Sequence, residues 1–204
     1  MKEYIVKKVS SPLALEDERW ERAEVAELNE GWNEFPKQYT TTAKLLYSDE
    51  GLYLRMQTNE WPIIVKETRE NHEVCLDSCM EFFFTPNTAD DIYVNFEANA
   101  HAVPLCSIRK DRERGKVVKS SKEGVVVKTI SEFESGWALY MFIPFEFLKK
   151  HFSSIGKEMR ANFYKCGEET LVDHYAVWNK IGTPEPDYHR PEFFGKLVLS
   201  DEIV

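Results

Sequence analysis

The chain has 204 residues and a formal net charge of −9 at pH 7, with 43% hydrophobic and 13% aromatic residues. This length and apolar content fit one domain with a substantial core, so we take residues 1–204 as a single domain. The acidic balance excludes nucleic acid as a partner, because phosphate binding requires clustered Lys and Arg. The basic run "RKDRERGK" (109–116) is interrupted by Asp111 and Glu113, which is typical of a solvated loop.

The sequence contains no apolar run long enough for a transmembrane helix, and no membrane span is expected. Its first residues, "MKEYIVKKVSSP", lack a signal-peptide apolar region, so we expect a cytoplasmic protein, or an exported one whose signal peptide is not in this sequence. The cysteines Cys75, Cys79, Cys106 and Cys166 show neither CxxC spacing nor a matching His pair. We therefore expect free thiols, no zinc site and no cofactor. The sequence gives no indication of oligomeric state.

The first predicted element is "EDERWERAEVAELNE" (16–30), in which good helix formers place Trp20, Glu24 and Leu28 four apart and indicate a helix. Downstream, apolar and polar residues alternate with a period of two and are rich in aromatic and β-branched types, which predicts strands. The predicted strands are 42–48, 52–58, 79–85, 91–99, 124–130, 136–144, 159–166 and 196–200. The segment "FEFLKKHF" (145–152) follows Pro144 and predicts a short helix.

Turn signals such as "SDEG" (48–51), "TPNTADD" (85–91) and "FESG" (133–136) separate the strands. In the first of these, we expect Gly51 to supply the positive φ of a hairpin turn. Short strands at near-regular spacing predict an all-β fold, an antiparallel β-sandwich of immunoglobulin or jelly-roll type with one or two short helices.

Chemistry-bearing motifs are sparse, since GxSxG, P-loop, GxGxxG and HExxH patterns are all absent. Glu81 is the first candidate, because a charged residue inside an otherwise apolar strand is usually paired or functional. Asn95, Glu97 and Asn99 share one face of the next strand. They form either the solvated face of a sheet or a row of acceptors for sugar hydroxyls.

Aromatic residues on loops are the second kind of candidate, because a sugar ring stacks its C–H face on an aromatic ring. Trp61 in "NEWPI", Trp178 in "VWNKIG" and Tyr188 in "PDYHRPEFFG" are placed where loops are expected. Each of these three side chains serves either core packing or ligand contact.

Five segments in order resemble the family 9 carbohydrate-binding modules: "TTAKLLYSDEGLYLRMQTNE", "DSCMEFFFTP", "DDIYVNFEAN", "GWALYMFIPFEFL" and "DYHRPEFFGKLVL". The resemblance spans about residues 20–199. It implies a β-sandwich related to DOMON-type folds that binds a carbohydrate, commonly a terminal sugar, without cleaving it. It also implies an extended entry segment around Trp20, with the Trp packed into the sandwich.

By position, the resemblance implies that Glu81 bonds sugar hydroxyls, assisted by Asn95 and Glu97, and that Tyr188 stacks on the ring. His189 and Arg190 would frame the pocket from the same loop.

The sequence also departs from the family pattern in its aromatic clamp. The region before "DSCME" reads "NHEVC" (71–75) and lacks the expected Trp, for which Trp61 is the upstream substitute. A Tyr replaces the second Trp. Family members carry structural calcium, but "TADD" (88–91) is too sparse a carboxylate loop for us to assign one.

Two alternatives stay open at this point. The first is a glycoside-active enzyme using Glu81 with Glu97 or Asp77, which requires two carboxyl groups in one cleft. The second is a DOMON-like haem or redox domain, which requires an axial Met or His facing a cavity.

Overall fold

Thirteen strands are present in the computed structural model, which describes residues 1–33, 38–132 and 135–204. They are β1 (Glu3–Lys8), β2 (Ala26–Glu27), β3 (Thr41–Tyr47), β4 (Gly51–Thr58), β5 (Cys79–Thr85), β6 (Tyr93–Asn99), β7 (Pro104–Arg109), β8 (Gly115–Val117), β9 (Val126–Glu132), β10 (Gly136–Pro144), β11 (Glu158–Gly167), β12 (His174–Val177) and β13 (Gly195–Ile203). The helices are the single-turn α1 (Phe145–Lys149) and the 3-10 turns η1 (Glu18–Arg22), η2 (Val74–Leu76), η3 (Ser120–Glu123) and η4 (Pro191–Phe193).

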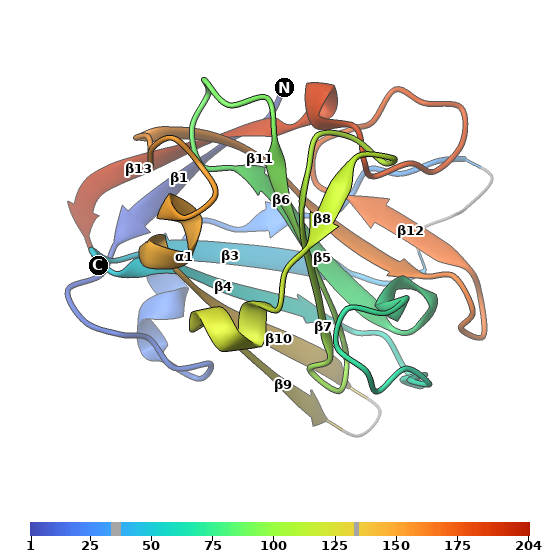
Figure 1. Ribbon diagram of the computed structural model, residues 1–204. Helices are drawn as coiled ribbons and strands as arrows, with labels where there is room; N and C mark the ends of the chain where they lie inside the picture. Colours follow the sequence, from blue (N-terminus) through green and yellow to red (C-terminus); the bar gives the residue numbers. More distant parts are fainter. Residues whose placement is uncertain (34–37, 133–134) are drawn as a thin grey trace.

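The strands form two layers that face each other, and Figure 1 shows β5, β6 and β7 crossing over β3, β4 and β10. The hydrogen-bonded order is β8-β7-β6-β5-β11-β13-β1-β3-β4-β10-β9, so β13 and β1 connect the layers. The all-β sandwich with few short helices is therefore confirmed. Its pairing is not wholly antiparallel, however, because β1 pairs in parallel with both β13 and β3.

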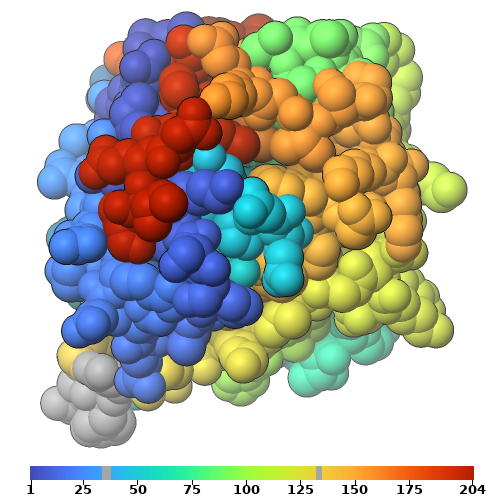
Figure 2. Space-filling model, turned by 90° about the vertical axis from the view of Figure 1, so that its left-hand side faces the viewer, coloured from blue at the N-terminus to red at the C-terminus, as the bar shows by residue number. Residues whose placement is uncertain are grey.

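Apolar residues from both layers make the central core. Phe82 of β5 stacks on Phe84 of the same strand and on Phe163 of β11. Leu54 of β4 and Leu139 of β10 belong to the same cluster. Each layer also has a smaller apolar cluster on its outer face, where loops cover the strands. Figure 2 shows the C-terminal end of β13 (red) beside the N-terminal segment (blue) and the β3–β4 turn (cyan).

All eight predicted strands and the helix after Pro144 are present, with ends that differ by a few residues. Period-two alternation did not identify β1, β2, β7, β8 and β12. The strands β2, β8 and β12 have four residues or fewer, and β1 has charged residues at half its positions. The strand β7 begins with Pro104 and has one β-branched and no aromatic residue. Phe133 and Glu134 of the expected "FESG" turn lie outside the described residues. None of the described helices has the length and apolar character needed to cross a membrane.

The predicted helix at 16–30 is wrong. Only η1 is helical there, and the chain then continues through β2. Trp20 is 1% exposed, and its indole N–H donates to the Ala14 carbonyl, 2.8 Å away. Burying Trp20 under the extended chain outweighs the local helix propensity, because propensity is a weak preference that tertiary packing overrides. The extended entry segment implied by the family resemblance is thus present.

The positive φ expected at Gly51 is also wrong, since the positive-φ glycines of the described chain are Gly124 and Gly136. Gly51 is needed for a different reason. A Cβ placed on it would lie 2.3 Å from the Ile143 carbonyl oxygen of β10. The glycine therefore allows close approach of two backbones.

Candidate functional site

A pocket of about 70 Å³ opens on the outer face of the β5–β6–β11 layer. Strand alternation sends Glu81 and Glu97 to this face, while their neighbours Phe82 and Phe96 enter the core. The loop that precedes β13 covers the floor. The pocket is lined by Cys75, Glu81, Glu97, Arg112, Glu168, Tyr175, Pro186, Tyr188 and His189.

Glu81 and Glu97 form the pocket floor as a cross-strand pair in direct register. Their side chains are 3% and 6% exposed. Burial raises the pKa of Glu81 well above its usual range, and the nearby Glu97 charge raises it further. Burial also raises the pKa of Glu97 to about 7. The pair therefore does not carry two full negative charges at neutral pH.

A chain of hydrogen bonds orients the Glu97 carboxyl group. Asn95 donates its amide N–H to Glu97 Oε1 at 2.7 Å, and Ser107 Oγ donates to Asn95 Oδ1 at 2.6 Å. Arg109 Nε in turn donates to Ser107 Oγ. Glu97 Oε2 is buried and has no hydrogen-bond partner among the described residues. One acceptor atom at the pocket floor is thus fixed in place and unsatisfied, a state that costs free energy until a donor arrives.

The cover of the pocket is aromatic and comes from residues 186–189. Tyr188 stacks on Tyr164 with ring centroids 4.2 Å apart, and its hydroxyl donates to the Lys165 carbonyl at 2.9 Å. His189 Nδ1 is hydrogen-bonded to the Tyr93 hydroxyl at 2.9 Å. Burial, reinforced by Arg112 and Arg109, lowers the pKa of His189 to about 3, so its ring is neutral.

The rim is more exposed and includes a cation. Arg112 donates to Asp187 Oδ1 at 2.8 Å and 3.2 Å, which ties the β7–β8 turn to the covering loop. Tyr175 of β12 is partly buried and contacts Tyr188 edge-on, with centroids 6.2 Å apart. An aromatic wall, a cation and two carboxyl groups therefore converge on one small opening.

Glu81, Glu97, Tyr188 and His189 of the predicted site residues line this pocket, and Asn95 lies behind Glu97. The polar face of β6 is buried, so the interpretation of a solvated sheet face is wrong. The prediction that Tyr188 is exposed on its loop is wrong, because Tyr188 is 7% exposed and packs against Tyr164 and, edge-on, against Tyr175. It offers the pocket part of its ring, not an open platform.

Other predicted residues lie elsewhere. Trp178 is 4% exposed and packs edge-on against Tyr4 and Phe163, so it belongs to the core. Trp61 is not among the residues that line the pocket. Arg190 turns outward to Glu192, 2.7 Å away.

Asp77 is also not among the residues that line the pocket. It accepts backbone N–H groups of Lys66 and Glu67 and the Asn99 amide, so it organises a loop instead of pairing with Glu81.

Sequence reasoning missed Cys75, Arg112, Glu168 and Tyr175 as pocket residues. Arg112 lies in the basic run interpreted as a solvated loop, and its charge pattern alone does not reveal the contact with Asp187. Tyr175 stands in a four-residue strand whose alternation is too short to identify.

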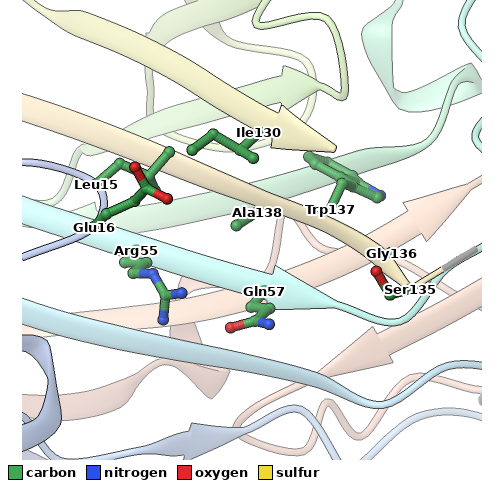
Figure 3. Close-up of a pocket in the computed structure, with 9 residues that line it drawn as sticks. All are labelled: Leu15, Glu16, Arg55, Gln57, Ile130, Ser135, Gly136, Trp137 and Ala138. Carbon is green, nitrogen blue, oxygen red and sulfur yellow. The ribbon is translucent and has the colours of Figure 1, made fainter. Parts of the chain in front are cut away.

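A second hollow of about 70 Å³ lies on the outer face of the other layer. Figure 3 shows Arg55 and Gln57 on β4 beside Ala138 on β10, with Glu16 on the N-terminal segment. None of the residues predicted from the sequence to bind a ligand lines this hollow. Among the residues that the structure describes there, Glu16 is the one carboxylate, so the hollow lacks a paired carboxyl floor like that of the first pocket.

Comparison with known proteins places this geometry in context. A family model described as carbohydrate-binding family 9 matches residues 9–199. Among solved structures, a protein from Bacteroides uniformis ATCC 8492, provisionally described as carbohydrate-binding, is 27% identical with a TM-score of 0.84. The alignment covers 98% of this chain and 99% of that one. The search of curated proteins found no match.

Two more distant structures share the fold. Both are of a family 9 carbohydrate-binding module from Caldicellulosiruptor kristjanssonii, one in complex with glucose and one with cellotriose. They are 15% and 14% identical, with TM-scores of 0.67 and 0.66. Each alignment covers 98% of this chain, and 97% and 95% of the respective module.

Proposed function

Because this chain belongs to carbohydrate-binding family 9, we propose that it binds a terminal sugar of an oligosaccharide or polysaccharide in the pocket floored by Glu81 and Glu97. The sugar would present one edge to the floor, since about 70 Å³ admits part of a ring and not a stretch of chain. Its binding would be non-catalytic.

The observation that carries this proposal is the hydrogen bonding of the two Glu97 carboxyl oxygens. Its Oε1 is held by Asn95, while its buried Oε2 lacks a partner among the described residues and belongs to a pocket-lining side chain. A sugar hydroxyl is a donor of the right size for such an acceptor. A hydrogen bond to an ionised carboxylate is worth about 1.5–3 kcal/mol, roughly twice a neutral one.

Aromatic and cationic groups at the rim support a carbohydrate further. Tyr175 and Tyr188 both line the opening, and their rings supply apolar surface for the C–H face of a sugar. Arg112 supplies N–H donors for ring or hydroxyl oxygens on the same side. This mixture of ring surface and convergent polar groups suits a neutral polyhydroxyl ligand.

The positions of the two carboxyl groups favour binding over hydrolysis. Glycosidic cleavage requires carboxyl groups that flank the scissile bond, so that one acts from each side of it. Glu81 and Glu97 are adjacent cross-strand residues that rise from the same floor in the same direction. They would both meet the same edge of a bound sugar.

The haem alternative gains no support in the described residues. The pocket is much smaller than the roughly 300–1,000 Å³ typical of cofactor sites. His189, which lines it, already has Nδ1 engaged by Tyr93.

Calorimetric titration with glucose and with cellotriose, the sugars of the Caldicellulosiruptor complexes, tests the proposal. We expect Glu97→Gln to weaken binding about tenfold or more, because an amide N–H replaces the unsatisfied acceptor. Glu146→Gln is the matched control, since Glu146 is exposed on α1, where it pairs with Lys149 away from the pocket.

Two results would contradict the proposal. One is sugar affinity that is equal in the wild type and in a folded Glu97→Gln variant. The other is release of glucose from cellotriose by the wild type that Glu97→Gln abolishes, because the pocket would then be catalytic.

A further inference from the structure

A cluster of sulfur and carboxylate atoms lies at Glu81, and its two cysteines, which are fully buried beside the pocket floor, have no role in the sugar hypothesis. Cys79 of β5 and Cys166 of β11 are in direct cross-strand register, and Glu81 lies two residues after Cys79 on the same face. One ligand atom from each residue lies within 4.8 Å of the other two. We propose that Cys79, Cys166 and Glu81 bind a thiophilic divalent cation such as Zn²⁺.

The distances fit the ion. Zinc bonds thiolate sulfur at about 2.3 Å and carboxylate oxygen at about 2.0–2.2 Å, so two ligands of one tetrahedral zinc lie about 3.8 Å apart. The Cys166 thiol at present donates to Glu81 Oε1 across 2.9 Å. Small side-chain rotations therefore bring all three ligand atoms to coordinating separation, and the strand register limits larger displacements.

The pocket supplies the rest of a coordination sphere and the route of entry. Glu81 lines the pocket together with Cys75, which is partly buried, and Glu97. The Oε2 atom of Glu97, which is buried and has no hydrogen-bond partner among the described residues, also indicates that this floor can take a positive or donating group. A fourth ligand from Cys75, Glu97 or solvent would complete a tetrahedron, as in zinc sites with one open position.

Charge and chemical type favour zinc over calcium or magnesium. Two sulfur ligands and one oxygen suit a borderline-soft ion, whereas calcium takes six to eight oxygens. On binding, each cysteine thiol and the Glu81 carboxyl group release their protons to solvent. The two thiolates offset the charge of the ion, the Glu81 carboxylate leaves the site with one net negative charge, and no oxidation state changes. The spacing of Cys75 and Cys79 in the sequence gave no hint of this site, because Cys166 joins it only through strand pairing.

Metal content of the intact chain tests the site without any sugar. Protein treated with chelator and kept reduced is loaded with ZnCl₂, desalted and measured for zinc per chain. Cobalt(II) replaces zinc in a parallel sample, because a thiolate-to-cobalt charge-transfer band reports sulfur ligation directly. We expect one zinc per chain and a cobalt band, with zinc affinity reduced at least tenfold in Cys79→Ser and in Cys166→Ser.

Cys106→Ser is the matched control, since Cys106 is equally buried but lies in the central core. Glu81→Gln is the second probe, because it keeps the shape of the floor if a cysteine variant fails to fold, and it should also weaken zinc binding. No zinc uptake, uptake unaffected by these variants, or a Cys79–Cys166 disulfide formed in preference to metal would overturn the proposal. The sugar titrations are run with chelator present, so they measure sugar binding without zinc. Failure of the zinc proposal and failure of the sugar proposal are therefore distinguishable.

Discussion

Lys165 and Glu60 form an ion pair, 3.0 Å between Nζ and Oε2, in which each side chain is only 1% exposed. Lys165 stands between Tyr164 and Cys166 on β11, so its side chain enters the interior while theirs belong to the buried cluster on the outer face of that layer. Glu60 also accepts hydrogen bonds from Ser78 and Trp137. The strand β11, which pairs with the floor strand β5, is thus fixed from behind by a fully desolvated charge pair.

Removing one partner of this pair should be costly. We expect Lys165→Met to lower the free energy of unfolding by about 3–5 kcal/mol, because it leaves a buried and uncompensated carboxylate. Urea denaturation monitored by tryptophan fluorescence measures the change. The double variant Lys165→Met/Glu60→Gln should recover part of the loss, and equal or greater destabilisation of the double variant would contradict the ion-pair interpretation.

The pH dependence of folding stability tests the environment of His174, which lies in the same buried region. Its Nε2 lies 2.8 Å from Lys165 Nζ, and burial, followed by the Lys165 charge, lowers its pKa from 6.5 to about 4. Between these two values the unfolded chain binds a proton that the folded chain does not. The stability contributed by neutral His174 is therefore fully present above pH 6.5 and is lost as the pH falls to 4.

Comparison of wild type with His174→Gln isolates that contribution. The raised pKa values of Glu81 and Glu97 make the fold more stable at low pH, but they do so in both proteins, so their effect cancels in the difference. We expect the wild type to lose about 1–3 kcal/mol more than the variant between pH 7 and pH 4. Chemical denaturation at each pH is the measurement. Parallel pH profiles for the two proteins would mean that the pKa of His174 is the same in the folded and the unfolded chain, which contradicts this prediction.

Tyr175 is the aromatic residue that we expect to matter most for sugar affinity. It lines the pocket and is partly buried, whereas Tyr188 is buried against Tyr164. Tyr175→Ala should weaken glucose or cellotriose binding by about 0.5–1.5 kcal/mol, while Tyr175→Phe, which keeps the ring, should change it less. Calorimetry of both variants decides this. Equal losses in the two would assign the contribution to the hydroxyl and not to the ring.

The sequence was sufficient for the fold and for part of the pocket, because period-two alternation reports directly which side chains share a sheet face. It identified Glu81 as an anomalous charge in an apolar strand, and the structure places that residue on the pocket floor. It could not identify Arg112 or the Cys79–Cys166 pairing, since both depend on contacts between segments distant in the chain. Trp178 shows the opposite failure, because residue type alone does not distinguish a ring packed in the core from one exposed on a loop.

Gly51 permits a test in which local sequence and structure predict different results. A turn glycine with positive φ tolerates Asn far better than Ala, because Asn enters the left-handed region readily. In the structure the constraint is the Ile143 carbonyl oxygen, 2.3 Å from any Cβ at position 51, and that oxygen belongs to the backbone of β10. We therefore expect Gly51→Ala and Gly51→Asn to be destabilising to a similar extent, by about 1–3 kcal/mol each. Thermal or urea unfolding of the two variants compares them, and a clearly milder effect for Asn would restore the turn explanation.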